Sequence, residues 1–227
     1  MRPPVRRILL ATAVALGVTA APAAASCLPS STQSIFDRNP AVVIATVVEQ
    51  RMGTLTLAIE RSLKGDVPTG RLEVANPTGT SIALNVPVGT RLGLGLHASA
   101  QGGYGANNCD HAEPSGLTRA AGPRPAYVVG GRRQLLLLDQ GGHEQRRITV
   151  PGLVTAVARG WQPGVVALRT AAGVATRDVF SEEASFSPPK SVRASRAFRI
   201  KGKTLLRDGQ RVATLPAGRW TSATSLR

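Results

Sequence analysis

Two cysteines are the residues of this chain whose type and spacing suggest chemistry most directly. Cys27 and Cys109 are the only cysteines in the 227 residues, and about 80 residues separate them. In an oxidising compartment an even number of cysteines most simply indicates a disulfide. A bridge that closes a loop of this length would stabilise the fold by roughly 4–5 kcal/mol in the chain-entropy account. We therefore predict a Cys27–Cys109 disulfide.

Cys27 also allows a second chemistry, the attachment of a lipid. A lipoprotein cysteine follows a short motif with a branched aliphatic residue three positions before it, whereas Ala24, Ala25 and Ser26 precede Cys27. A thioether at Cys27 would also leave Cys109 without its partner. A lipid anchor through Cys27 is therefore the alternative to the disulfide.

The other residue types that commonly carry out chemistry are few and poorly spaced. The chain has three histidines, His97, His111 and His143. The stretch "CDHAEP" at 109–114 places a cysteine, a histidine and two carboxylates together, but it lacks the ligand spacings of zinc sites. Neither a Gly-x-Ser-x-Gly elbow nor a phosphate-binding loop with its lysine occurs. We predict no catalytic residue, no metal site and no cofactor, and hence a protein that is not an enzyme.

Positive charge is concentrated in the second half of the chain, although the formal net charge of the whole is +15. Six basic and six acidic residues lie between positions 26 and 112, against nineteen basic and seven acidic residues between 113 and 227. This asymmetry indicates two regions with different surfaces, of which the basic one would attract polyanions. Arginine outnumbers lysine 24 to 4, which a GC-rich codon bias also produces, so a merely solvated basic surface is the alternative.

The densest basic stretch surrounds "FRIKGK" at 198–203. Its basic residues alternate, so that a strand would project them from one face. Together with two arginines just before, they form our candidate anion-binding site: Arg193, Arg196, Arg199, Lys201 and Lys203. No aromatic residues are interleaved to stack on bases, so we expect anionic envelope polymers or lipid surfaces rather than specific nucleic acid. Charges that keep an edge strand from pairing with another chain would explain the same residues.

The first 25 residues have the pattern of an export signal. Three arginines precede an uncharged apolar run at 8–21, and three alanines follow at 23–25. This is the order of a secretory signal peptide, and the apolar run is shorter than the roughly 20 residues of a membrane span. We expect cleavage after Ala25 or Ser26. The mature protein would then be secreted, extracellular or at the cell surface, without a transmembrane segment.

The mature first half shows the patterns of β-strands. The stretch "AVVIATVVEQ" at 41–50 is rich in β-branched residues, and "TLTLAIERSLKGD" at 54–66 alternates apolar and polar residues. In "TRLGLGLHAS" at 90–99 the leucines share one face, whereas Gly93 and Gly95 lie on the other. Glycines on a strand indicate a bend or the close approach of another backbone.

In their order, these stretches resemble the netrin-like OB barrel of tissue inhibitors of metalloproteinases and of bacterial secreted proteins. The resemblance covers about residues 27–112, and it rests on the strand order, on "SLKGD", and on the two cysteines that enclose the strands. It implies a small barrel domain at 26–112 whose role is binding. The opening Cys-x-Cys of the family is absent, because Leu28 and Pro29 follow Cys27.

The animal members of this family suggest one alternative function. There the resemblance would give Cys27 the role of chelating the zinc of a protease through its α-amine and carbonyl. Cleavage after Ala25 would leave Ser26 in front and displace the amine by roughly 3.5 Å of chain, which excludes the chelate. Cleavage after Ser26 would allow it, so metalloprotease inhibition depends on the processing site.

A different organisation follows in the second half. We predict a linker at 113–125, where prolines and glycines coincide with the change in charge, and β-hairpins at 126–227. Asp208-Gly209 has the composition of a hairpin turn. Two hairpins, ending at Pro151 and Pro216, look alike at an offset near 65 residues, which favours an incomplete β-propeller or a truncated longer protein. The alternative is that β-hairpins resemble one another without being repeats.

These observations together predict an all-β protein, with an OB-like barrel followed by β-hairpin repeats. The expected function is that of a non-catalytic secreted or cell-envelope interaction module. Its partner would be an unidentified protein or, through the basic C-terminal half, an anionic envelope polymer.

Overall fold

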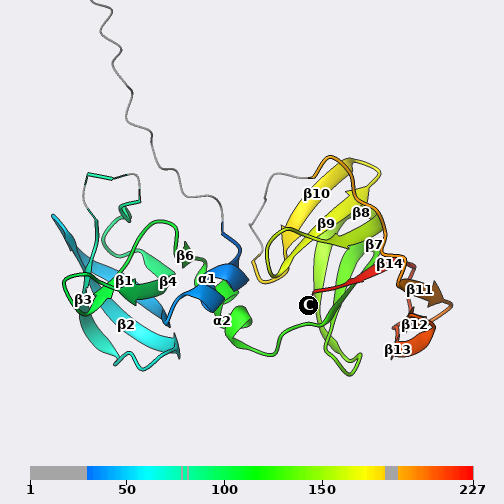
Figure 1. Cartoon of the computed structure of the whole chain (residues 1–227), viewed down its shortest axis with the longest axis horizontal. Coiled ribbons are helices and arrows are strands. Elements are labelled where there is room, and N and C mark those ends of the chain that lie inside the picture. The colour runs from blue at the N-terminus through cyan, green and yellow to red at the C-terminus, as the bar shows by residue number, and fades with distance from the viewer. Residues whose placement is uncertain (1–29, 78, 81, 182–188, 227) are drawn as a thin grey trace, which may run out of the picture.

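A computed structural model describes residues 30–77, 79–80, 82–181 and 189–226 of the chain (Figure 1). Most of these residues lie in β-strands and the two helices are short, which confirms the predicted all-β fold class. One sheet is built from the first half of the chain and two from the second half, and both helices lie between the halves (Figure 1). The signal predicted at 1–25 and Cys27 lie outside the described residues.

The strand pairings of the first sheet return to the strand from which they start. They run from β1 to β2, β3, β5 and β4, and β4 pairs with β1. The short β6 pairs with β4 as well. The strands of this sheet are β1 (Ala41–Arg51), β2 (Thr54–Lys64), β3 (Gly70–Ala75), β4 (Arg91–Ala98), β5 (Tyr104–Gly105) and β6 (His111–Ala112).

Two short helices, neither of which we predicted, connect this sheet to the second half. Helix α1 (Thr32–Arg38) starts after Ser31, whose side-chain oxygen accepts a hydrogen bond from the Ser34 backbone N–H at 3.1 Å. Such N-caps satisfy one of the backbone donors left free at a helix start. Helix α2 (Pro114–Ala121) has proline at its first position, where the missing N–H costs nothing. It lies within the stretch that we expected to be a linker.

Strand β1 is buried on both faces because each face belongs to a different core. Alternate residues from Ala41 to Val47 join the leucines of β2 and β4 inside the first sheet. Between them, Val42 and Ile44 point the other way and pack with Ile35 of α1 and Leu117 of α2. The β-branched composition of this strand therefore serves two layers at once.

The glycines of β4 explain how the helices approach the first sheet so closely. A Cβ atom on Gly93 would lie 2.6 Å from Cδ1 of Leu117, and one on Gly95 would lie 2.3 Å from Nδ2 of Asn39, the residue that ends α1. We expected a bend or the close approach of another backbone at these glycines, but the atoms that come nearest belong to the side chains of Leu117 and Asn39.

The second sheet is an antiparallel sheet of five strands in the order β10-β9-β8-β7-β14. On β7, Leu135 and Leu137 enter one core with β8 and β9, whereas Leu136 and Leu138 enter another on the opposite face. The strands are β7 (Tyr127–Leu138), β8 (Glu144–Arg159), β9 (Val165–Thr170), β10 (Gly173–Asp178) and β14 (Trp220–Ser225).

The hairpin that we predicted to end at Pro151 does not end there. Strand β8 continues through Pro151 to Arg159, and it exchanges β7 for β9 as its main partner along the way. The register of β7 against β8 shifts between Arg132 and Gln134, and Arg133 adopts a positive φ of 59°. A proline is tolerated at such an irregularity because the ladder there does not need its N–H.

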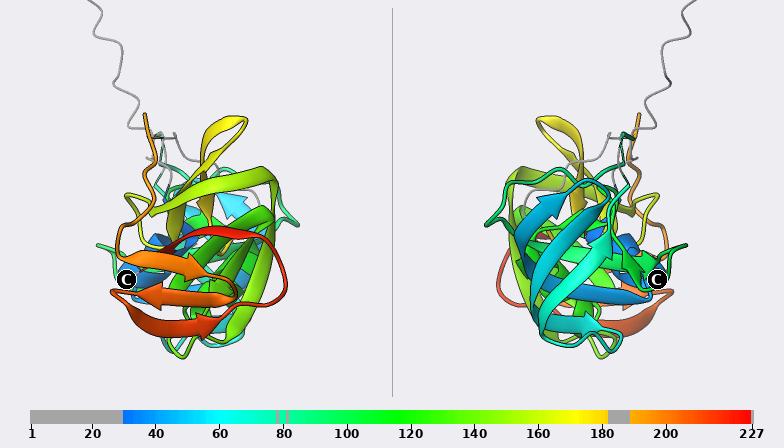
Figure 2. Two further views of the ribbon diagram at one scale, coloured as in Figure 1. Left: turned by 90° about the vertical axis from the view of Figure 1, so that its right-hand side faces the viewer. Right: turned by 90° about the vertical axis from the view of Figure 1, so that its left-hand side faces the viewer.

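The third sheet contains the last predicted hairpin, and its strands are β11 (Phe198–Lys201), β12 (Thr204–Arg207) and β13 (Gln210–Thr214). Asp208 and Gly209 have φ values of 50° and 85°, which confirms the predicted turn. One side of this sheet packs on the second sheet, with Leu205 and Leu215 in the same core as Leu136. Its other side faces outward at the end of the molecule remote from the first sheet (Figures 1 and 2).

Candidate functional site

The outward side of the three-stranded sheet carries a cluster of positive side chains. We call it the cationic face and define it by four residues, Arg199, Lys201, Lys203 and Arg211. All four are exposed. The left panel of Figure 2 views the molecule from the end where this sheet lies.

Strand alternation and register create the cationic face. Phe198 and Ile200 of β11 are partly buried against the core, so Arg199 between them points to solvent. Arg199 pairs with Leu206 of β12, and Leu206 pairs with Arg211 of β13. Like-facing residues are roughly 7 Å apart along one strand and roughly 10 Å apart across two strand spacings. The face therefore holds several cations at intervals close to those of charged groups along a polyanion.

The segment that contains this cluster carries almost no negative charge of its own. Residues 189–226 contain nine basic residues and a single acidic one, Asp208. Oδ2 of Asp208 lies 3.7 Å from Nε of Arg207. The guanidinium of Arg207 also lies over the Phe198 ring, with 5.9 Å between Cζ and the ring centroid. Among the ion pairs that the structure describes, none involves a residue of the cationic face. Its charge is therefore available to an external anion.

The structure places the predicted anion-binding residues in two groups. Three belong to the cationic face: Arg199 and Lys201 on β11, and Lys203 in the turn before β12. The prediction that one strand projects all three is therefore wrong for Lys203, because β11 ends at Lys201 and the chain turns there. Arg193 and Arg196 are exposed as well, but they precede β11 and lie outside any strand. Sequence reasoning did not identify Arg211 as a member of this site. The Asp208-Gly209 turn could have indicated it, because this turn sets the register of β12 against β13.

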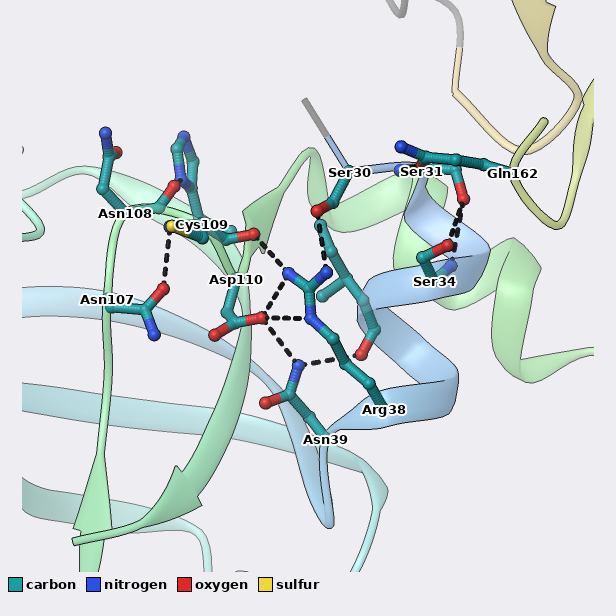
Figure 3. A network of polar contacts seen from close by, with 12 residues as sticks. Ser30, Ser31, Ser34, Arg38, Asn39, Asn107, Asn108, Cys109, Asp110 and Gln162 are labelled. Atoms are coloured by element: carbon teal, nitrogen blue, oxygen red, sulfur yellow. Dashed lines mark hydrogen bonds and ion pairs between the residues drawn. The ribbon is translucent and has the colours of Figure 1, made fainter. Parts of the chain in front are cut away.

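The other predicted site residue, Cys109, lies where the start of the described chain meets the first sheet (Figure 3). The guanidinium of Arg38 donates a hydrogen bond to the Cys109 carbonyl at 2.6 Å and another to Oγ of Ser30 at 2.7 Å. The backbone N–H of Cys109 donates to Oδ1 of Asn107 at 2.8 Å. One arginine side chain thus contacts both Cys109 and the residue three positions after Cys27.

A buried carboxylate fixes this arginine. Asp110 is 6% exposed, and its Oδ1 accepts from Nε of Arg38 at 2.8 Å and from Nδ2 of Asn39 at 2.9 Å (Figure 3). The same Asn39 amide donates to the Ile35 carbonyl at 2.9 Å. The end of α1 is therefore tied to the segment that contains Cys109.

The polar groups of the "CDHAEP" stretch face different partners. Nδ1 of His111 lies 2.8 Å from the Asn108 carbonyl, and Oε2 of Glu113 lies 3.4 Å from Nη2 of Arg119. Within the described ranges, no group of three or more His, Cys, Asp or Glu side chains is arranged to hold a metal ion.

A second buried carboxylate, that of Asp178, attaches the beginning of α1 to the second sheet. Asp178 is 0% exposed, and it accepts from the backbone N–H groups of Thr32 and Phe180, each at 2.8 Å. Burial raises the pKa of the Asp178 carboxyl above its ordinary value, because these hydrogen bonds offset only part of the lost hydration. Beside it, Oγ of Ser31 donates to the Pro163 carbonyl at 2.7 Å. Helix α1 is therefore hydrogen-bonded to both halves of the chain.

Comparisons of this chain with protein-family models, with curated proteins and with solved structures found no match. Neither helix in the described ranges is long and apolar enough to span a membrane.

Proposed function

We propose that this chain is a non-catalytic interaction protein of the cell envelope or the extracellular space, and that its cationic face binds anionic polymers. The observation that carries the proposal is the charge balance of that face, where three exposed cations lie on one side of a sheet and a fourth, Lys203, lies in the adjoining turn, and none of them has a carboxylate partner among the described residues. Such an arrangement attracts polyanions by releasing their counterions, and it needs no deep pocket.

The regular spacing of the cations favours a polymer over a single small anion. A chain with repeated negative groups would contact several members of the face together, so that weak individual contacts add up. The strands expose no row of aromatic rings on this side, so stacking of nucleic-acid bases has no support. Acidic polysaccharides or polymers with phosphate groups along their backbone are the ligands that fit.

The first half completes the proposal as a compact binding unit of the netrin-like OB type. The closed order of pairings from β1 through β5 and β4 back to β1 supports it.

We also propose that a Cys27–Cys109 disulfide fastens the mature N-terminus. Ser30 and Cys109 both accept hydrogen bonds from the Arg38 guanidinium, so they lie close together. The three peptide units from Cys27 to Ser30 can span roughly 10 Å. This reach is enough to bring the Cα atoms of Cys27 and Cys109 within the roughly 7 Å that a disulfide requires.

The binding proposal can be tested with dextran sulfate and with uncharged dextran, which share one backbone. We expect the full exported chain to bind dextran sulfate and not dextran. The triple variant Arg199→Gln, Lys201→Gln, Lys203→Gln should lose affinity on the order of a hundredfold, because each cation at an anionic surface contributes about 1 kcal/mol.

A charge-matched control separates the cationic face from net charge alone. Arg61, Arg71 and Arg169 are exposed elsewhere on the molecule and belong to none of the described ion pairs. Replacing these three by glutamine removes the same charge and should change the affinity much less. An equal loss in both triple variants would contradict a localised site.

A further inference from the structure

A pocket adjoins the cationic face where β13 and the turn before it meet the second sheet. Its volume is about 460 Å³, which lies within the range of ligand-binding pockets. We call it the turn pocket. Six of its lining residues carry polar side-chain groups: Tyr127, Gln140, Arg207, Asp208, Gln210 and Arg211. Because Arg211 also belongs to the cationic face, a ligand on that face can reach into the turn pocket.

The turn pocket carries a net positive charge. Arg207 and Arg211 contribute two guanidiniums, whereas Asp208 contributes the one carboxylate of the lining. Oδ2 of Asp208 lies 3.7 Å from Nε of Arg207, and the Asp208 side chain is 71% exposed. Such a surface pair is weak, so the carboxylate neutralises Arg207 only in part. Arg211 belongs to none of the described ion pairs, and an anionic group is therefore attracted to its side of the pocket.

Neighbouring side chains hold the lining of the turn pocket in place. The rings of Tyr127 and Phe198 meet edge to face, with 5.9 Å between their centroids and 68° between their planes. The guanidinium of Arg207 lies over the same Phe198 ring. On β13, Nη2 of Arg211 donates a hydrogen bond to Oγ1 of Thr214. Side chains that are fixed in advance lose less conformational freedom when a ligand binds.

Uncharged polar groups distinguish the turn pocket from a simple anion site. Gln210 is exposed, and its amide offers N–H donors together with a carbonyl acceptor. Gln140 contributes a second amide, and the half-buried Tyr127 contributes an aromatic ring with a hydroxyl. The hydroxyl groups of a sugar both donate and accept, so they match these amides, whereas an ionised phosphate group only accepts. The lining therefore favours a charged sugar over a phosphate.

We infer that the turn pocket binds one uronic acid unit of an acidic polysaccharide, that is, a sugar ring that carries a carboxylate. The carboxylate pairs with the guanidinium of Arg211 in charge-assisted hydrogen bonds. The ring hydroxyls bond to the amides of Gln210 and Gln140, and a C–H face of the ring packs against Tyr127. The inference rests on the proposed function, because the rest of the polymer lies along the cationic face.

The test compares three small ligands on the full exported chain by isothermal titration calorimetry. They are tetragalacturonate, its neutral methyl ester, and linear tetraphosphate, which is at least as highly charged as the sugar acid. Attraction by charge alone predicts that tetraphosphate binds at least as tightly as tetragalacturonate. We expect tetragalacturonate to bind about tenfold more tightly, because one or two additional hydrogen bonds contribute that much. Equal or tighter binding of tetraphosphate, or an equal affinity for the methyl ester, would overturn the inference.

The variant Gln210→Met separates recognition of the sugar from attraction by charge, because it leaves every charge in place. Its affinity for tetragalacturonate should fall about fivefold, whereas its affinity for tetraphosphate should stay within about twofold. Gln145→Met is the matched control, since Gln145 is an exposed glutamine on β8 that does not line this pocket. Unchanged affinity for tetragalacturonate in Gln210→Met, or an equal loss in the control, would contradict the assignment.

Dextran sulfate keeps a failure of this inference apart from a failure of the proposed function. If the cationic face binds dextran sulfate but the chain does not prefer tetragalacturonate to tetraphosphate, the turn pocket is not a sugar site and the proposed function stands. If dextran sulfate does not bind while tetragalacturonate binds and depends on Gln210, the pocket is supported and the polymer-binding face is not. If neither ligand binds, both proposals are wrong.

Discussion

The replacement Gly95→Ala tests how α1 is attached to the first sheet. The new methyl carbon would lie 2.3 Å from Nδ2 and 2.6 Å from Cγ of Asn39, distances that real structures do not tolerate. Asn39 is 3% exposed and donates to both the Ile35 carbonyl and Oδ1 of Asp110. The methyl group must therefore displace a buried amide that makes two hydrogen bonds.

Two contributions set the expected loss of stability. Overpacking a dense core costs about 1–3 kcal/mol, and each lost hydrogen bond costs about 1 kcal/mol. We therefore expect Gly95→Ala to lower the free energy of unfolding by about 3–5 kcal/mol. With Asn39→Ala already present, the space is empty and the hydrogen bonds are gone. The same glycine change should then cost about 1 kcal/mol or less, which leaves a coupling of about 2–4 kcal/mol between the two positions.

Urea unfolding of the four proteins of this double-mutant cycle measures the coupling. Gly116→Ala is the control, because Gly116 lies in α2, its added Cβ would meet no atom closer than 3.4 Å, and alanine is favoured in helices by about 1 kcal/mol. If the costs of Gly95→Ala and Asn39→Ala simply add, the close approach is not what makes glycine necessary in β4.

Two further predictions concern ionisation and covalent structure. Because burial raises the pKa of Asp178 in the folded chain, the folded state binds more protons than the unfolded state between the ordinary value of 3.8 and the raised one. The contribution of Asp178 to stability should therefore fall as pH rises through that window. Urea unfolding of the wild type and of the variant Asp178→Asn measures this contribution as the difference between their free energies of unfolding at each pH. A difference that does not change with pH would contradict the prediction. If Cys27 and Cys109 form the proposed disulfide, the mass of the exported protein should increase by two hydrogens on reduction. Neither cysteine should react with an alkylating reagent before the protein is reduced. Rapid alkylation of Cys109 in the untreated protein would exclude the bridge.

Local patterns in the sequence predicted the strands and turns that depend on neighbouring residues alone. Alternation identified the buried Leu55 and Leu57 of β2, because a half-buried strand repeats every two residues. The pair Asp208-Gly209 identified its turn, because both residues tolerate positive φ. The glycines of β4 even indicated that another element comes close.

Features that depend on tertiary packing were not predictable in the same way. Helices of seven and eight residues are too short to be stable alone, and α1 and α2 exist because Ile35 and Leu117 fill the space over β1. The continuation of β8 past Pro151 depends on an irregular register that involves Arg133 of the neighbouring strand. The cationic face combines Arg199 of β11 with Arg211 of β13 through the pairing of β12 with both strands, so no single stretch of sequence contains all of it.

The salt dependence of dextran sulfate binding tests the central claim of this account most directly. The logarithm of the affinity should fall linearly with the logarithm of the salt concentration, because each cation that contacts the polymer releases counterions. In the variant with Arg199, Lys201 and Lys203 replaced by glutamine, we predict a slope shallower by about two, whereas the control at Arg61, Arg71 and Arg169 should keep the wild-type slope. Equal slopes in the wild type and in the variant of the cationic face would show that the polymer binds elsewhere.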